Sequence, residues 1–399
     1  MDVVVALEAR FARTPDGAVW TIVGFARPSW DRYLQVFDRV SVVARVLQVD
    51  WVSSDWVRAD GERVSFVAVP HYLGPWQYLL RAVRVKKAVR NAVGPEDAVI
   101  LRVGSQLAAV MEPALIRSGR PFGLEVVGDP YDVFAPGAVA HPLRPIFRRW
   151  FSRQLRRQCG AASAVAYVTE YALQSRYPPG KGAFATHFSD IELPGSAFAS
   201  APRSPRRAGD LIRSLFVGSL EQLYKSPDVL IDAVGACCRR GMNLRMTMIG
   251  DGKYRPELEE RVRQSGLSDR LHFLGQVPAG EAVRARMDEA DLFILPSRTE
   301  GLPRAMIEAM ARGLPCIGST VGGIPELLPP EDMVPPGDVE ALAAKIEEVV
   351  SAPDRMARMS SRNLEKAREY RDDLLRSRRI NFYRHVKGAT QEWITAQGR

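Results

Sequence analysis

The chain has 399 residues, of which 46% are hydrophobic and 25% are charged, an ordinary globular composition at a length typical of two domains. Its formal net charge of +9 is moderate. The four cysteines, which include the adjacent pair Cys237 and Cys238, have no metal-ligand spacing, so we expect free thiols in a reducing compartment and no disulfides.

The first half alternates short apolar strands with amphipathic helices, a pattern typical of a parallel α/β layer. No secretory signal precedes the strand-like residues 2–7, and no apolar run approaches the roughly 18 residues of a membrane span, so we expect a cytoplasmic protein. Further strands are expected at 40–47, 63–69, 98–102, 122–127 and 163–168, and helices at 29–38, 74–93, 105–118 and 143–158.

Residues 143–157 combine apolar side chains at helical spacing with a strongly basic face, because six arginines and no acid lie between Arg144 and Arg157. One interpretation is attachment to an anionic membrane surface. The other, which we favour because an α/β layer needs a helix here, is an apolar stripe packed on the sheet with solvated arginines. No aromatic–basic interleaving accompanies these residues, so we do not expect nucleic-acid binding.

A polar, proline-rich stretch without periodicity, residues 199–207, separates the halves. The pattern then restarts, with strands expected at 213–218, 244–249, 271–274, 291–295 and 315–318, and helices at 226–240, 254–266, 279–288 and 303–312. The amphipathic stretch 355–388 is expected to extend from the second sheet.

We therefore expect an α/β protein with two Rossmann-like parallel-sheet domains. They should face each other across a cleft at the carboxyl ends of the strands, where open sheets bind ligands. The expected parts are a first domain at 1–200, a linker at 201–212, a second domain at 213–370, and a C-terminal helix at 371–399 that can return to the first domain.

The junction between strand 291–295 and the helix at 303–312 carries two acids. Glu300 lies before the helix, whose first turn accommodates Pro303, and Glu308 lies about one and a half turns inside it. Free N–H groups and the helix dipole make such a junction an anion site, and Glu308 can lean back toward it. A sugar nucleotide would use both the N–H groups and the carboxylates. Alternatively, Glu300 is an acid stabilised by the dipole and Glu308 is a solvated surface acid.

Glycine turns follow four other strands of the second half, at Gly218, Gly250, Gly275 and Gly322. A single glycine turn is more often a connection than a site. Four at one edge, together with Lys225 as a cation that can reach a phosphate, favour a binding site. The first strand lacks a G-x-G-x-x-G sequence, which argues against a dinucleotide-dependent dehydrogenase.

These stretches resemble the donor domain of retaining glycosyltransferases of the GT-B fold, family 4 (group 1). The E-x7-E pair of that family falls on Glu300 and Glu308. The matching stretches, in the family's order and spacing, are 216–220 with Lys225, 248–252, 272–275, 300–303 with 308–311, and 322–326.

By that resemblance, Glu308 would hold the ribose hydroxyls, Glu300 would contact the donor sugar, and Lys225 would neutralise the departing diphosphate. The N–H groups around Gly301 and Leu302 would meet the phosphates. The implied donor-binding residues are Gly218, Ser219, Lys225, Gly250, Gly252, Val277, Glu300, Gly301, Leu302, Pro303 and Glu308, with Gly252 and Val277 near the base.

Ser219 is the first departure from the family, which commonly has an arginine at this position beside the diphosphate. Stabilisation of the leaving group would then rest on Lys225 and backbone donors, or on a compensating Arg298 or Arg304.

The second departure lies on the acceptor side, where Gly128-Asp129 replaces the usual His-Asp. Asp129 is the candidate to face the reaction centre, and the alternative is an Asx turn before Pro130. Asp16 and Gly17 could form a mobile loop on the acceptor side, although Asp-Gly is more often simply a turn.

The resemblance implies a retaining glycosyltransferase that uses no metal and no cofactor. It would move a sugar from a nucleoside-diphosphate sugar, with a UDP-sugar favoured, to a hydroxyl of a polysaccharide, lipid-linked or secondary-metabolite acceptor. A lipid-linked acceptor would place residues 143–157 at the inner face of a membrane. The alternatives are an epimerase or hydrolase of the same fold, and, because of Ser219 and Gly128, a non-catalytic nucleotide-sugar-binding protein.

Overall fold

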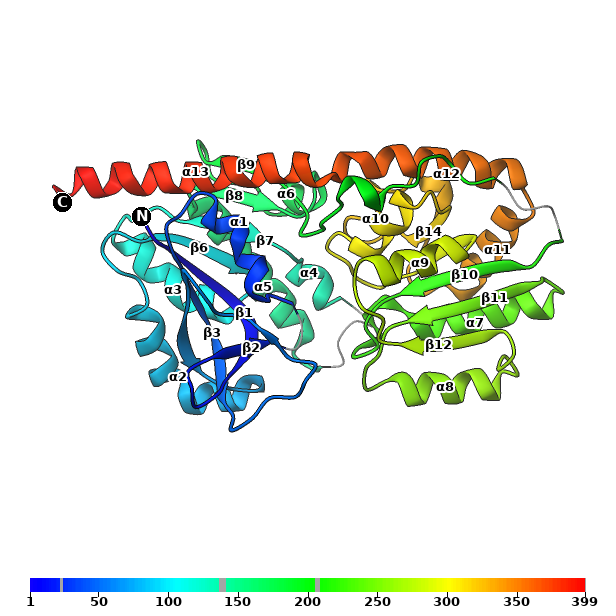
Figure 1. Cartoon of the computed structure of the whole chain (residues 1–399), viewed down its shortest axis with the longest axis horizontal. Coiled ribbons are helices and arrows are strands. Elements are labelled where there is room, and N and C mark those ends of the chain that lie inside the picture. Colours follow the sequence, from blue (N-terminus) through cyan, green and yellow to red (C-terminus); the bar gives the residue numbers. More distant parts are fainter. Residues whose placement is uncertain (22–23, 136–140, 205–208, 399) are drawn as a thin grey trace. The chain divides into compact units, whose positions relative to one another are not determined.

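The computed structural model describes residues 1–21, 24–135, 141–204 and 209–398, and linker residues 205–208 therefore lie outside it. The chain divides into two compact units. Unit 1 comprises residues 1–128, 150–188 and 376–399, and unit 2 comprises residues 129–149 and 189–375. Each unit has a largely parallel sheet covered by helices (Figure 1), which confirms the predicted α/β class.

The sheet of unit 1 is built around β1 (Val3–Arg13), which pairs in parallel with β3 on one side and β6 on the other. The parallel order is β5-β3-β1-β6-β7-β8-β9. The other strands are β3 (Val40–Gln48), β5 (Val64–Pro70), β6 (Ala98–Val103), β7 (Gly123–Val126), β8 (Ala164–Tyr167) and β9 (Phe184–His187). All six residues of β6 are buried, as a parallel sheet covered on both faces requires.

β1 continues well beyond the predicted end of the first strand at residue 7. Its last two residues pair antiparallel with β2 (Val19–Thr21), and β2 pairs in turn with β4 (Val57–Arg58). The prediction stopped early because Glu8 and Arg10 interrupt the apolar run. The ladder with β3 shifts register in this stretch and then resumes.

Helices cover both faces of the unit 1 sheet. One face is covered by α2 (Gly74–Arg90), α3 (Gln106–Arg117), the second part of α5 (Arg144–Ala161) and α6 (Ala172–Arg176). Their buried side chains, among them Val85, Leu107, Leu155 and Leu173, share one apolar core with the strands. The other face is covered by η1 (Arg27–Trp30), α1 (Asp31–Leu34) and α13 (Asp372–Ala396).

A buried polar cluster fastens α1 and α13 to this second face. The Glu125 carboxylate on β7 accepts hydrogen bonds from Arg102 Nη1 at 2.7 Å and from the hydroxyls of Tyr33 and Tyr383 at 3.1 and 3.2 Å. The two tyrosine rings stack with centroids 4.7 Å apart. Burial raises the pKa of Tyr383 well above its ordinary value, so its hydroxyl stays protonated and donates to the carboxylate.

Unit 2 contains a six-stranded parallel sheet in the order β12-β11-β10-β13-β14-β15 among the residues described. Its strands are β10 (Ile212–Val217), β11 (Leu244–Ile249), β12 (Leu271–Gly275), β13 (Leu292–Leu295), β14 (Cys316–Ser319) and β15 (Met333–Val334). Five of these follow their predicted positions to within one residue at each end, because each is a compact apolar run between turn residues.

Helices α7 (Pro227–Arg239), α8 (Arg255–Gln264), α9 (Glu281–Glu289), α10 (Arg304–Ala311), α11 (Val339–Val350) and α12 (Pro353–Ala367) surround this sheet (Figure 1). Unit 2 also includes α4 (Pro130–Val133) and the first part of α5. The short 3-10 turns are η2 (Gly195–Ala197), η3 (Leu223–Lys225), η4 (Ile324–Glu326), η5 (Pro330–Asp332) and η6 (Arg368–Tyr370).

The amphipathic stretch 355–388 is not one helix. α12 ends at Ala367, and Arg371 takes an extended conformation with φ −59° and ψ 142° before α13 begins. From Arg376 onward α13 belongs to unit 1 rather than to unit 2.

Cys159, Cys237 and Cys316 are buried and Cys238 is half-buried, and all four are free thiols. In the described ranges, no helix is both long enough and apolar enough to span a bilayer. In the same ranges, no group of three or more His, Cys, Asp or Glu side chains is placed to hold a metal ion.

Candidate functional site

The sheet of unit 2 changes its winding direction at β10. Strands β11 and β12 lie on one side of β10, and β13, β14 and β15 lie on the other. The loops after β10 and β13 therefore leave adjacent carboxyl ends in opposite directions, which is where open α/β sheets bind ligands. The first of these loops carries Lys225 and the second carries Glu300.

Lys225 and Glu300 form an ion pair at this point. Lys225 Nζ lies 2.7 Å from Glu300 Oε1, and the two side chains are only 14% and 9% exposed. Ser297 Oγ donates a second hydrogen bond to the same oxygen at 3.0 Å. The lysine stem crosses Gly218, where an added Cβ would lie 2.4 Å from Lys225 Cδ. A glycine at the end of β10 thus makes room for the cation.

Arg298 holds the turn that carries Lys225. Its Nη1 and Nη2 donate to the two carboxylate oxygens of Asp228 at 2.8 and 2.7 Å. Nη1 also donates to the carbonyl of Leu223, and the Arg298 amide donates to the carbonyl of Tyr224 at 2.7 Å. The bond to Asp228 raises the pKa of Arg298. Because its guanidinium is committed to Asp228 and this turn, Arg298 does not compensate for Ser219.

Ser219 stays exposed at the end of β10 and serves its own loop. Its hydroxyl accepts a hydrogen bond from the amide of Glu221 at 3.2 Å. The position that carries a cation in the resembling family is therefore occupied here by a small neutral group.

The loop after β14 supports the backbone around Glu300. Gly322 has a φ of +53°, and an added Cβ would lie 1.9 Å from the Glu300 carbonyl oxygen. The amide of Gly323 donates to the carbonyl of Gly301 at 2.6 Å. α10 begins at Arg304, with Pro303 as its extended N-cap residue. Within the described part of the chain, the N–H groups of Gly301 and Leu302 form no hydrogen bond, so both can serve a ligand.

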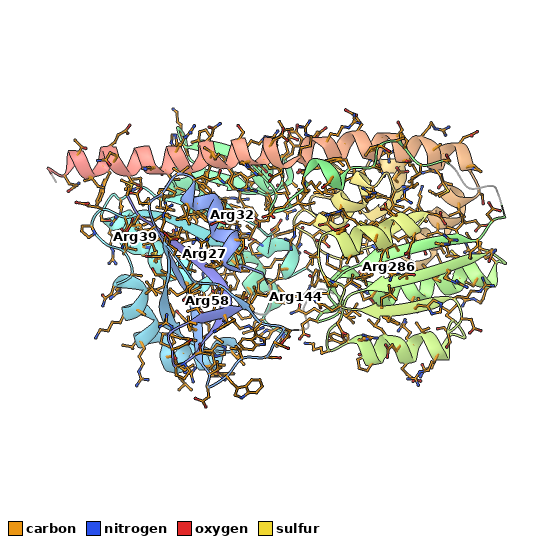
Figure 2. All side chains as sticks on the ribbon, viewed as in Figure 1. Arg27, Arg32, Arg39, Arg58, Arg144 and Arg286 are labelled. Carbon is orange, nitrogen blue, oxygen red and sulfur yellow. The ribbon has the colours of Figure 1, made fainter. Side chains whose placement is uncertain are left out.

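Glu308 lies inside α10 in a half-buried position. Burial raises its pKa, and the positive charges of Arg304 and Arg284 oppose that rise. Arg284 comes from α9, and Arg286 on the same helix (Figure 2) pairs instead with Glu289 at 3.0 Å. No hydrogen bond to the Glu308 carboxylate is formed by the described residues. A partly buried carboxylate of this kind favours a ligand that brings its own hydroxyl donors.

Backbone hydrogen bonds join the remaining predicted loops of this edge. The amide of Gly218 donates to the carbonyl of Ile249, and that of Gly250 donates to the carbonyl of Gly275, both at 2.9 Å. Gly252 follows in the loop after β11, and the half-buried Val277 follows β12. The structure therefore brings the loops of all predicted donor-side residues to one edge of one sheet.

Asp129 and Asp16 are each engaged in their own turn. The Asp129 carboxylate, buried at 6% exposure, caps α4 by accepting from the amide of Tyr131 at 2.8 Å. The Asp16 carboxylate accepts from Thr14 Oγ1 at 2.5 Å, and this bond lowers the pKa of Asp16. Asp16 and Gly17 form the tight turn between β1 and β2. Both carboxylates therefore form the hydrogen bonds of a local turn, which is the alternative that the sequence left open for each of them.

Unit 1 contains a polar cluster that the sequence interpretation did not single out. Glu8 accepts from the amide of Gln106 at 2.9 Å and pairs with Arg45 at 3.1 Å. Glu8 also borders an open pocket of about 480 Å³, which is lined further by Arg10, Trp20, Phe25, Trp56 and His71. The available signal was that Glu8 and Arg10 occupy alternate positions directly after the apolar run of the first strand.

Of the stretch 143–157, all but Leu143 lies in α5, which starts at Arg144 (Figure 2). Leu155 is buried in the core of unit 1, as the favoured cover-helix interpretation requires. Toward the other end, Leu143, Ile146 and Trp150 are 48%, 59% and 62% exposed. The arginines are not simply solvated, because Arg157 pairs at 3.0 Å with the fully buried Glu112.

Residues 212–352, which contain all of this edge, match the family described as glycosyl transferases group 1. The chain is 26% identical over 329 residues to protein CapJ of Staphylococcus aureus, covering 81% of this chain and 80% of CapJ. It is 24% identical to the alpha-D-kanosaminyltransferase of Streptomyces kanamyceticus, covering 86% of this chain and 89% of that enzyme.

Solved structures show the same fold. HepE of Anabaena, solved in complex with UDP and glucose, superposes with a TM-score of 0.63 at 18% identity, covering 94% of this chain and 97% of HepE. Sucrose-phosphate synthase of Thermosynechococcus elongatus superposes with a TM-score of 0.68 at 17% identity, covering 97% and 100% of the two chains. These neighbours have the GT-B fold that the sequence predicts.

Proposed function

We propose that this chain, a group 1 glycosyltransferase with the GT-B fold, transfers a sugar from a nucleoside-diphosphate sugar to an acceptor hydroxyl. We favour a uridine diphosphate donor, because HepE was solved with UDP and glucose and a pneumococcal O-GlcNAc transferase with UDP and GlcNAc. The observation that carries the proposal is the Lys225–Glu300 pair at the change of winding direction, beside the two unpaired N–H groups of Gly301 and Leu302.

Lys225 is the proposed stabiliser of the leaving group. When the bond between the anomeric carbon and the diphosphate breaks, negative charge grows on the diphosphate and positive charge on the sugar ring. An ammonium held in a nearly buried position loses little solvation when it meets that charge. In the absence of donor the Glu300 carboxylate holds this ammonium in place.

The backbone and the second acid complete the proposed donor site. The N–H groups of Gly301 and Leu302, next to the start of α10, would receive the phosphate oxygens. Glu308 would accept hydrogen bonds from the ribose hydroxyls, which supply the donors that its carboxylate lacks in the protein. Once Lys225 turns to the diphosphate, Glu300 would be free to accept from the sugar hydroxyls.

We further propose that no metal ion takes part and that the anomeric configuration is retained. Lys225 and the two N–H groups provide the positive potential that a divalent cation supplies at other phosphate sites. Full turnover in excess chelator is the expected result, and an absolute requirement for added Mg²⁺ or Mn²⁺ would overturn this part. Proton NMR of the first-formed product reads its anomeric configuration directly.

The acceptor is proposed to be a hydroxyl of a polysaccharide precursor, a lipid-linked intermediate or a secondary metabolite. The pocket beside Glu8 is our candidate acceptor contact in unit 1, because aromatic faces such as Trp20 and Trp56 suit the apolar faces of sugar rings. A lipid-linked acceptor would bring the protein to a membrane surface. The exposed Leu143, directly before α5, and the exposed Ile146 and Trp150 within it support that placement.

The test begins with thermal shifts in a panel of UDP- and GDP-sugars. A donor at 100 times its Kd stabilises by about 2.7 kcal/mol, so the right one stands out. Product analysis follows with and without acceptor. Sugar transfer that requires acceptor supports the proposal, whereas epimerised or hydrolysed donor at the same rate without acceptor supports the alternative activities. A donor that binds but is never consumed indicates a non-catalytic binder.

A further inference from the structure

Helix α2 of unit 1 is apolar on two opposite faces. Its inner face, which includes Tyr78, Val85 and Val89, packs into the core of the unit. On the outer face, Trp76, Leu79, Leu80 and Val83 are 78%, 62%, 86% and 81% exposed. A cover helix normally presents polar residues to solvent, so an exposed apolar cluster of this size points to a partner.

The spacing shows that these four residues form one stripe. Positions 76, 79, 80 and 83 are i, i+3, i+4 and i+7, which lie together on one side of a helix. The same stripe continues through Lys87 and Arg90, one and two turns beyond Val83. The outer face of α2, defined here as Trp76, Leu79, Leu80, Val83, Lys87 and Arg90, is therefore apolar in its first half and cationic in its second.

The charge around this face has one sign. Arg81, Arg84 and Lys86 are also exposed, and no acidic residue occurs between Glu62 and Glu96 in the sequence. Among the described residues, none of the basic side chains of α2 forms an ion pair. Their charge is thus uncompensated within the protein and available to an anionic partner.

Basic and aromatic residues continue beside α2. Gln106 at the start of α3 donates to the Tyr78 hydroxyl of α2 at 3.1 Å. The same Gln106 borders a pocket with Trp150, Arg153 and Arg157 of α5. The neighbouring surface of unit 1 therefore also carries the exposed Trp150 and the exposed Arg153.

We propose that the outer face of α2 docks unit 1 onto an anionic lipid bilayer. Trp76 lies at the level of the headgroups, Leu80 and Val83 enter the boundary of the acyl chains, and Lys87 and Arg90 bind anionic headgroups. A second copy of the chain fits less well, because its own α2 face has no acidic group to pair with these cations. This docking rests on the proposed function, because a lipid-linked acceptor would be reached at the membrane surface.

The experiment measures co-sedimentation of the full chain with vesicles that contain phosphatidylglycerol or phosphatidylcholine alone. We expect binding to the anionic vesicles and little binding to the neutral ones. Leu80→Asp should lower the partition coefficient by roughly tenfold or more, since it replaces a buried apolar side chain by a charge. Its matched control is Leu374→Asp, a leucine on α13 that is 44% exposed and outside this surface.

The charges are tested in the same way. Lys87→Ala combined with Arg90→Ala should lower the partition by about 25-fold, at about fivefold for each charge removed near the surface. The control removes two arginines from unit 2, with Arg263→Ala and Arg368→Ala. Equal losses in both pairs would show that binding follows net charge alone and would overturn the docking site.

Three further results would also overturn the proposal. They are the absence of wild-type binding to anionic vesicles at low salt, unchanged binding of Leu80→Asp, and a dimer in solution that Leu80→Asp dissociates. Donor binding is measured on the same proteins without vesicles, by thermal shift. Wild-type donor binding by Leu80→Asp shows that the variant is folded. Docking without donor turnover would refute the proposed function alone, and turnover without docking would refute this inference alone.

Discussion

Replacing Lys225 by alanine removes the cation that the structure places at the change of winding direction of the second sheet. The ammonium lies 2.7 Å from Glu300 Oε1 with only 14% of its side chain exposed, so the variant leaves a carboxylate that is 9% exposed with Ser297 as its side-chain donor. Two effects follow, one on stability and one on the reaction, and they can be measured separately.

The loss of stability follows from the pair itself. A hydrogen bond between charged groups contributes about 1.5–3 kcal/mol. At about 2–4 °C per kcal/mol for a domain of this size, Lys225→Ala should lower Tm by about 3–12 °C. The double variant Lys225→Ala/Glu300→Ala should regain part of this loss, because it no longer leaves a nearly buried carboxylate without its cation.

The loss of activity should be larger and should not be regained. Removing one preorganised group from a developing negative charge costs about 10² to 10³ in kcat. Transfer from labelled donor, measured at saturating donor and acceptor, gives kcat for Lys225→Ala, for the double variant and for Lys366→Ala. Lys366 is a half-buried lysine on α12 that pairs with Glu369, and it serves as control. Wild-type kcat in Lys225→Ala, or recovery of kcat in the double variant, would refute the assigned role of Lys225.

The remaining predictions concern Glu308, Asp129 and Arg298. Burial raises the pKa of Glu308, so the folded state favours its protonated form. That contribution to stability is complete below the unfolded pKa and is lost as pH rises through the folded pKa. Glu308→Gln should therefore flatten the fall of Tm with rising pH in the absence of donor, which thermal melts across the pH range would check. It should also weaken donor binding about 10- to 100-fold, which donor titrations would check. Asp129→Asn should keep the α4 cap and full kcat. Asp129→Ala should lower the free energy of unfolding by about 1 kcal/mol, measured by urea denaturation. A large loss of kcat in Asp129→Asn would instead show that the carboxylate takes part in the reaction. Arg298→Lys should lower both Tm and kcat, because a lysine cannot donate to both carboxylate oxygens of Asp228 and the turn that carries Lys225 is then held less firmly. An unchanged kcat together with a lowered Tm would show that Arg298 has only a structural role.

The second sheet could be predicted closely because its first five strands are short, largely apolar runs, and four of them end at or directly before a glycine or proline. The pairing of Lys225 with Glu300 is partly implied by that order, since their loops follow neighbouring strands. The ion pair between Arg298 and Asp228 could not be predicted, because 70 positions separate the two residues and nothing in their local sequence links them. Sequence reasoning offered Arg298 as a compensating cation, and only the packing shows its supporting role.

The first unit was predicted less completely. β1 continues through Glu8 and Arg10, whose polar side chains look like the end of a strand until the structure shows partners and a pocket around them. The outer face of α2 was present in the sequence as a second apolar stripe. It was overlooked because the inner stripe already accounts for the helix, and the exposure of a residue such as Leu80 depends on which stripe the sheet covers.

The participation of α13 in unit 1 has a consequence for the order in which the protein folds. Tyr383 stacks on Tyr33 and donates to Glu125, and Val386 occupies the space left by Gly123. The ribosome makes these residues only after all of unit 2, so the unit that begins synthesis first cannot complete its core until the second sheet has been translated. Until α13 is made, the side of β7 that α13 covers stays exposed in unit 1, where chaperones can bind it. Domains usually complete their folding in the order of their synthesis, and here unit 2 can complete its fold before unit 1.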